Sequence, residues 1–187
     1  MSIKNFKTRR NASSNEEEIR KRFYKVFKNS PIPSNEILSN LSLYIKRQDL
    51  AQILFMNDLY KQIKNVHGSI FEFGVRWGRN TVLLSTLRGI YEPFNHNRKI
   101  VSFDTFEGFK SLDNKDGTDE SINEGAFNVT DDYVEYLKDV LDYHETESPI
   151  SHIKKYELIK GDATKTIKSY LENNEQTIIA LAYFDFD

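Results

Sequence analysis

The sequence contains no cysteine, which excludes a disulfide framework and any metal site built from thiolate ligands. It also lacks an excess of positive charge, because its formal net charge is -2. Proteins that bind nucleic acids usually carry a clear basic excess. We therefore expect no nucleic-acid partner.

Long apolar runs are missing as well. The longest one, Ile178 to Phe184, is far too short to cross a bilayer, so we expect no membrane partner. The N-terminal stretch "MSIKNFKTRR" is basic, but no apolar core follows it as in a secretory signal. These absences predict a soluble, cytoplasmic protein. With 39% hydrophobic residues among 187, the chain is able to form one domain with a core.

The first third of the chain has a helical character. A polar tail over residues 1–15 leads into a helix over 15–27, whose first turn is acidic and whose later turns are basic. Two more helices are predicted over 35–45 and 48–66. We interpret residues 1–66 as a tail followed by cap helices.

From Gly68 onward, short apolar runs alternate with helical stretches. Strands are predicted over 69–75, 99–106, 156–162 and 177–187, and helices over 79–89, 131–141 and 164–174. Gly89 is expected to end the first of these helices, and Thr130 to cap the second. This alternation indicates an α/β fold over residues 67–187, with a doubly wound parallel sheet covered by helices.

Acidic residues lie at or near the end of every predicted strand. They are Glu72, Asp104, Asp162, Asp185 and Asp187. A single acid at a strand end is unremarkable, because loops favour aspartate. Ligands of such sheets bind beyond the carboxyl ends of the strands, so the repetition suggests a ligand with several hydrogen-bond donors lying across the strand tips.

The stretch "FEFGVRWGRN" joins the first strand to its helix through Gly74 and Gly78. Glycine allows a sharp turn and a close approach between the backbone and a ligand. Asp104, at the end of the second strand, is where doubly wound folds bind the ribose hydroxyls of an adenosine cofactor.

Two adenosine cofactors compete for this loop. Nicotinamide dinucleotides favour the spacing G-x-G-x-x-G, which leaves room for a pyrophosphate. Here three bulky residues separate Gly74 from Gly78, and the carboxylate of Glu72 would repel phosphate but attract an ammonium group. Both features favour S-adenosylmethionine over NAD, which makes a Rossmann-type oxidoreductase the less favoured alternative.

Four segments in this order resemble the macrocin O-methyltransferase family, which belongs to the class I S-adenosylmethionine-dependent methyltransferases. They are "GSIFEFGVRWGRNT", "VSFDTFEGF", "LIKGDATKTI" and "IIALAYFDFD". The family methylates hydroxyl groups of sugars on antibiotics and related small molecules. The resemblance therefore implies a Rossmann-like sheet with an N-terminal helical cap, and an O-methyltransferase acting on a sugar hydroxyl.

The resemblance also assigns roles to the acids and glycines. It places Glu72, Gly74 and Gly78 at the methionine end of the cofactor, Asp104 at the ribose and Asp162 near the adenine. The final "FDFD" is similar to a family motif whose acids lie beside a divalent metal, usually magnesium, and the acceptor hydroxyl. This implies Asp185 and Asp187 as metal ligands, with Asp185 also catalytic.

The chain stops at Asp187, inside that motif, whereas the family continues into further strands. The sequence therefore predicts a truncated methyltransferase that ends after its fourth strand and is incomplete for catalysis. A non-catalytic module that binds a nucleotide or a partner remains an alternative. An oligomerisation role for the helices over 16–63, giving a homo-oligomer, is a further one.

Overall fold

The computed structural model describes residues 13–108 and 128–186. These residues form two compact units that meet within helix α3 (Arg47–Ile63): residues up to Leu54 belong to a helical unit, and those from Phe55 onward to a sheet unit. The boundary between residues 66 and 67 that we expect from the sequence stays a prediction. None of the helices in the described ranges has the length and apolar character needed to span a membrane.

The helical unit begins with α1 (Ser14–Lys28). Ser13 and Glu16 form a capping box, in which the Glu16 amide donates to the Ser13 hydroxyl and the Ser13 amide donates to the Glu16 carboxylate at 2.8 Å. The helix expected over 35–45 is instead a short α2 (Ser34–Ile37) followed by the 3-10 helix η1 (Leu38–Tyr44). The backbone leaves helical geometry at Asn40, which explains the interruption.

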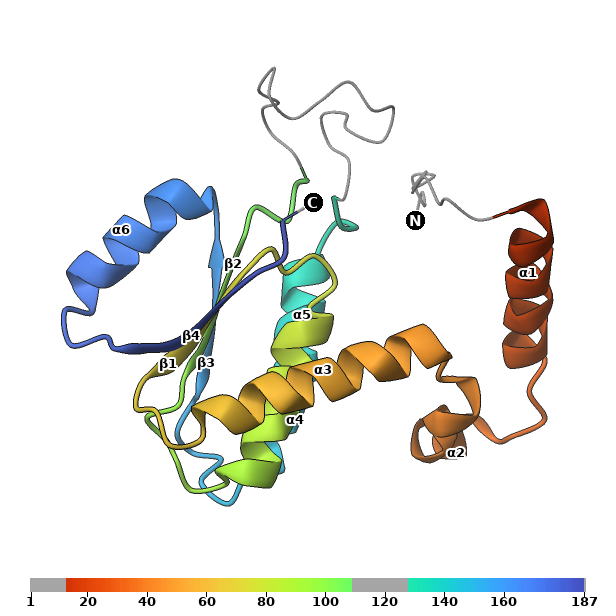
Figure 1. Ribbon diagram of the computed structural model, residues 1–187, viewed down its shortest axis with the longest axis horizontal. Helices are drawn as coiled ribbons and strands as arrows, with labels where there is room; N and C mark the ends of the chain where they lie inside the picture. The colour runs from red at the N-terminus through yellow and green to blue at the C-terminus, as the bar shows by residue number, and fades with distance from the viewer. Residues whose placement is uncertain (1–12, 109–127, 187) are drawn as a thin grey trace. The chain divides into compact units, whose positions relative to one another are not determined.

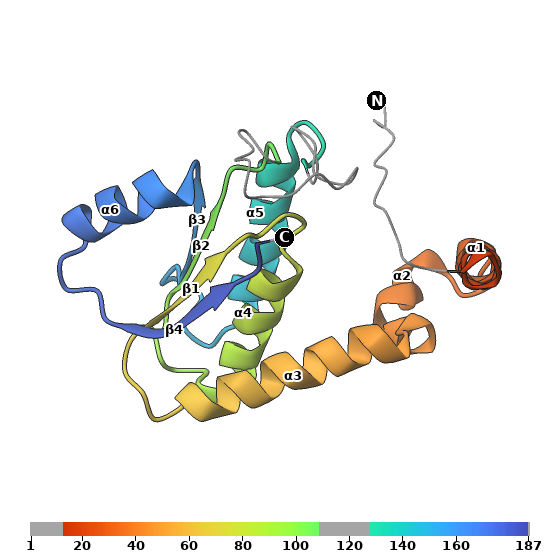
Figure 2. The same ribbon diagram turned by 45° about the horizontal axis from the view of Figure 1, so that its top comes forward.

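The sheet unit contains four parallel strands in the order β3-β2-β1-β4. They are β1 (Ser69–Phe73), β2 (Ile100–Asp104), β3 (Tyr156–Lys160) and β4 (Ile179–Phe184). β1 and β2 are central, and four of the five residues in each are buried because helices cover both faces of these strands. Figure 2 shows β4 beside β1 at one edge of the sheet. This arrangement confirms the predicted Rossmann-like α/β class.

Helices cover the two faces of the sheet unequally, as Figure 1 shows. On one face lie α4 (Arg79–Tyr91), α5 (Tyr133–Thr146) and the second half of α3, whose Met56 and Tyr60 pack on Leu84 of α4. On the other face lies α6 (Ala163–Asn173), whose Tyr170 packs on an aromatic cluster from β1 and β2: Phe71, Phe73 and Phe103.

Two predicted helix boundaries are wrong. Helix α4 passes through Gly89 and continues to Tyr91, whose hydroxyl donates to the side chain of Asn57 at 2.7 Å. A tertiary contact thus holds the last turn in place despite the glycine. The N-cap of α5 is Asp132, with a left-handed φ of 62°, rather than Thr130.

A buried cluster of ion pairs joins α4, α5 and the start of β3. The Glu145 carboxylate pairs with the guanidinium of Arg88 and, at 2.8 Å, with the ammonium of Lys155. All three side chains are almost fully buried. Arg88 also donates to the carbonyl of Lys155 at 3.0 Å. One carboxylate therefore neutralises two buried cations.

We expect Glu145→Ala to destabilise the sheet unit by about 3–5 kcal/mol, because it leaves Arg88 and Lys155 buried without their counter-ion. Urea unfolding at neutral pH measures this loss. Glu135→Ala on the same helix is the matched control, since Glu135 forms an exposed pair with Lys138 and should cost less than about 1 kcal/mol. Equal losses in the two variants would contradict this role of the buried cluster.

Candidate functional site

The strand order places a switch point between β1 and β4. The chain runs from β1 through β2 to β3 in one direction and then returns to the other side of β1 as β4. In open α/β sheets, ligands bind outside the carboxyl ends of the strands at such a point. Glu72 lies on β1, Gly74 directly follows it, Asp104 ends β2, and Asp185 follows β4. The fold thus brings four of the predicted site residues to one edge.

The turn after β1 depends on Gly74, which has a left-handed φ of 89°. A β-carbon at this position would collide with the carbonyl oxygen of Asp185 and lie 2.9 Å from its carbonyl carbon. The amide of Asp185 donates to the carbonyl of Phe73 at 2.8 Å, which holds the two segments together. The protein's own backbone thus approaches Gly74 closely, and the contact with a ligand that the sequence predicts for this glycine stays a prediction.

Gly78 caps α4 with a left-handed φ of 71° and is buried. A β-carbon here would lie 2.7 Å from a methyl group of Leu137 on α5. Both glycines of the loop are thus required by conformation and packing. The loop between them is shaped by the fold before any cofactor arrives.

Asp104 holds this loop against the end of β2. One of its carboxylate oxygens accepts hydrogen bonds from the amides of Val75 at 2.6 Å and Arg76 at 2.8 Å. The other accepts from the amide of Phe106 at 2.6 Å. A carboxylate has about four acceptor positions, so these bonds leave about one for a ligand. Asp104 therefore positions the loop in addition to its predicted contact with ribose.

Glu72 is fully buried beneath the turn. Its Oε2 accepts hydrogen bonds from the hydroxyls of Thr81 and, at 3.1 Å, Ser102. Its Oε1 has no hydrogen-bond partner in the described part of the chain. Burial raises the pKa of this carboxyl to about 8; the two hydroxyls lower it, and the charges of Asp185 and Asp104 raise it further. The site thus contains a buried carboxyl with one acceptor atom to spare.

Asp185 is exposed at the tip of β4, and one of its carboxylate oxygens accepts a hydrogen bond from the side-chain amide of Asn80 at 3.0 Å. Asn80 lies in the first turn of α4 and is buried. Asp187, the second predicted metal ligand, lies outside the described residues. Among residues 13–108 and 128–186, no group of three or more acidic or histidine side chains is arranged to hold a metal ion.

Asp162 follows β3 and caps α6. Its carboxylate accepts hydrogen bonds from the amide of Thr164 at 2.9 Å and from the hydroxyl of Thr164 at 2.7 Å. The amide of Gly161 donates to the carbonyl of Asp104 at 2.9 Å, so Asp162 follows at the same edge of the sheet. Its observed role is that of a helix cap, and its proximity to adenine stays a prediction.

The sequence pattern missed three polar residues that act on this site: Asn80, Thr81 and Ser102. Two of them lie in the first turn of α4, directly after the glycine loop. The available signal was the presence of polar residues in a helix that packs on the sheet, at positions that face the sheet. Their partners, Asp185 and Glu72, follow from the sheet register and could not be identified from spacing alone.

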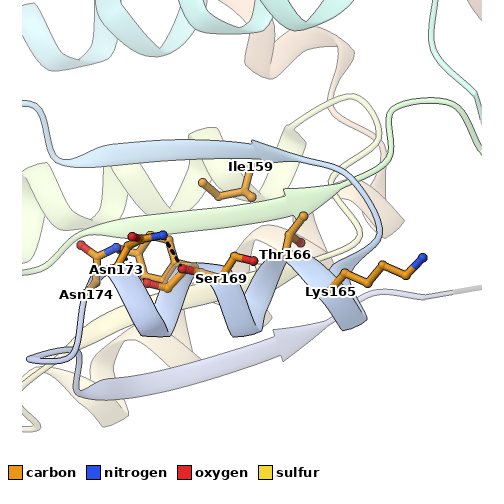
Figure 3. A pocket seen from close by; sticks show the side chains of 7 residues that line it. Ile159, Lys165, Thr166, Ser169, Asn173 and Asn174 are labelled. Atoms are coloured by element: carbon orange, nitrogen blue, oxygen red, sulfur yellow. Dashed lines mark hydrogen bonds between the residues drawn. The ribbon is translucent and has the colours of Figure 1, made fainter.

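Figure 3 shows a separate open groove of about 320 Å³ along α6 beside β3. It is lined by Ile159, Lys165, Thr166, Ser169, Tyr170, Asn173 and Asn174. The side-chain amides of Asn173 and Asn174 donate to backbone carbonyls of α6. None of the predicted site residues that the structure describes lines this groove, so it is distinct from the edge described above.

No protein-family model and no curated protein matches the sequence. Several solved structures do, and two of them are structures of CalS11. The crystal structure of CalS11, a calicheamicin methyltransferase, superposes with a TM-score of 0.90 and is 41% identical; the match covers 99% of this chain and 72% of that one. The apo structure of CalS11, a TDP-rhamnose 3'-O-methyltransferase, gives a TM-score of 0.79 and 40% identity, and the match covers 95% of this chain and 68% of that one.

The two glycines Gly74 and Gly89 provide a matched pair of alanine substitutions. Gly74→Ala should destabilise the sheet unit by about 2 kcal/mol or more, through the left-handed φ and the clash with Asp185. Gly89→Ala should stabilise it by about 0.5–1 kcal/mol, because nothing lies within 4 Å of the added methyl group. Thermal and urea unfolding measure both changes. A harmless Gly74→Ala would show that β4 does not approach the turn this closely.

The Glu72 carboxyl should make stability depend on pH. The unfolded chain releases this proton near the ordinary pKa of 4.5, whereas the folded chain keeps it until about pH 8. Between these values the folded state binds more protons, so stability falls as pH rises. Glu72→Gln removes this titration. Its free energy of unfolding relative to that of the wild type should therefore rise between pH 5 and pH 8, by an amount on the order of a few kcal/mol.

Urea unfolding at several pH values measures this gain. Glu157→Gln serves as the control, because Glu157 on β3 is only partly buried and pairs with Lys99 at the surface. It should follow the wild type at every pH. If the stability of Glu72→Gln also ran parallel to that of the wild type, the pKa of Glu72 would not be raised.

Proposed function

Because the chain belongs to the family of S-adenosylmethionine-dependent sugar O-methyltransferases that includes CalS11, we propose that it methylates a hydroxyl of a sugar or sugar-containing small molecule. The observation that carries the proposal is the 41% identity to CalS11 across 99% of this chain. CalS11 is a TDP-rhamnose 3'-O-methyltransferase, so its acceptor is TDP-rhamnose. A nucleotide-linked deoxysugar is accordingly the first acceptor to test.

The buried Glu72 supports a site for the methionine end of the cofactor. Its Oε1 lacks a partner among the described residues and faces no counter-charge. The ammonium of S-adenosylmethionine would supply both a donor and a positive charge. Binding would therefore lower the pKa of Glu72 and release its proton. Gly74 and Gly78 shape the loop that lies above it.

Asp104 and Asp162 are the proposed contacts of the nucleoside. Asp104 lies at the end of β2 and has about one acceptor position left after its three backbone hydrogen bonds. One ribose hydroxyl can occupy that position, and the second must share an oxygen that already binds the loop. Asp162 follows the next strand and would lie on the adenine side.

Asp185 is the proposed catalytic base. In the reaction, the acceptor oxygen attacks the methyl carbon of the sulfonium, the bond between this carbon and sulfur breaks, and S-adenosylhomocysteine leaves. The hydroxyl proton passes to the carboxylate of Asp185. Asn80 holds that carboxylate at 3.0 Å from a buried position, which would orient it toward the acceptor.

Magnesium at Asp185 and Asp187 stays a prediction. Oxygen ligands suit this ion, which retains several waters and takes one or two protein carboxylates. The described residues contribute Asp185 alone to such a site and contain no group that could hold a metal by itself. A cytoplasmic location and a homo-oligomer complete the proposal.

Calorimetric titration with S-adenosylhomocysteine tests the cofactor site. We expect the wild type to bind, and Asp104→Ala to lose about 10- to 100-fold in affinity, because it removes a charge-assisted contact and loosens the loop. Thr164→Ala is the control and should change affinity little, because it removes only the hydroxyl that donates to Asp162, while the backbone amide of residue 164 still donates to this capping carboxylate. Unchanged affinity in a folded Asp104→Ala variant, or binding of NAD instead, would contradict the proposal.

A further inference from the structure

Helix α1 has an apolar face with little to cover it. Ile19, Phe23, Val26 and Phe27 are spaced so that they share one side of the helix. Phe23 and Phe27 contact the ring of Tyr44, at 6.4 and 4.8 Å between centroids. Ile19 and Val26 remain 58% and 57% exposed, and no residue of α1 is buried.

Other parts of the helical unit also expose large apolar side chains. They belong to η1 and the first half of α3, and are Leu38, Leu41, Leu43, Leu50 and Leu54. Single exposed leucines are ordinary, but many exposed large apolar side chains on one small helical unit favour an interaction site.

The charges of α1 indicate what covers this surface. Glu16, Glu17 and Glu18 lie in its first turns, and the later turns carry only basic charges, from Arg20 to Lys28. Two copies of α1 packed antiparallel would place the acidic end of each helix beside the basic end of the other. A parallel pair would place like charges together. The helix is thus complementary to itself in the antiparallel direction.

We propose that two copies of this chain associate through α1, packed antiparallel about a two-fold axis, with Ile19 of each copy opposite Val26 of the other. A two-fold interface is reciprocal, so the same contact occurs twice. It would cover Ile19 and Val26, the two most exposed side chains of the apolar face. The inference rests on the homo-oligomer of the proposed function and names its interface, and it does not require the methyltransferase activity.

The absence of cysteine makes a disulfide test clean. Ile19→Cys and Val26→Cys are each introduced alone at an exposed position, purified and oxidised separately or as a mixture. We expect the mixture to form a cross-linked dimer and each variant alone to stay uncross-linked, because opposing helix positions bring β-carbons within disulfide range only in the mixed pair. Lys21→Cys, which points away from the apolar face, mixed with Val26→Cys is the control and should not cross-link.

Sedimentation equilibrium of the wild type at tens of micromolar provides the second measurement, and a dimer is expected. A monomer would overturn the proposal, and a monomer is also the result expected if this face packed against its own chain. Cross-linking of Ile19→Cys with itself would show a parallel pair and would also overturn it. Equal cross-linking by the Lys21→Cys control would show that the cross-links arise from random collisions, which would also overturn the proposal.

Discussion

The carboxylate of Asp104 is the contact on which the geometry of the site depends. It accepts hydrogen bonds from two successive amides of the loop after β1 and from one amide of the turn after β2. Charge-assisted hydrogen bonds of this kind are short and strong. They hold the loop at the carboxyl end of β2, where a cofactor would bind. A single acid thereby couples the end of β2 to the loop after β1, and its partner Val75 lies 29 residues away in sequence.

The first turn of α4 completes the site because the loop fixes where that helix begins. Thr81 reaches down to the buried Glu72, and Asn80 reaches across to Asp185 after β4. One helix turn therefore holds both the carboxyl proposed to receive the cofactor ammonium and the carboxylate proposed to accept the proton. Displacing the helix would disturb both at once, so the packing of Gly78 on Leu137 supports the geometry of the proposed site as well as stability.

Much of the fold could be predicted from the sequence because buried parallel strands read as short apolar runs, and each ends at a turn marked by an acid or a glycine. The roles of individual residues could not be predicted in the same way. Asp162 illustrates this, since an acid after a strand is equally suited to cap the next helix and to meet a ligand, and the structure shows the cap. Gly89 is typical of a helix end, yet α4 continues to Tyr91, whose hydrogen bond to Asn57 stabilises the last turn. The roles of Thr81 and Ser102 depend on which strands are neighbours, and spacing along the chain does not contain this information.

The most direct measurement is a crystal structure of the protein with S-adenosylhomocysteine. We expect the ligand beyond the carboxyl ends of β1 and β2, with its ammonium within hydrogen-bond distance of Glu72 Oε1 and a ribose hydroxyl on Asp104. A ligand bound elsewhere, such as in the groove along α6, with Glu72 still lacking a partner, would contradict this account.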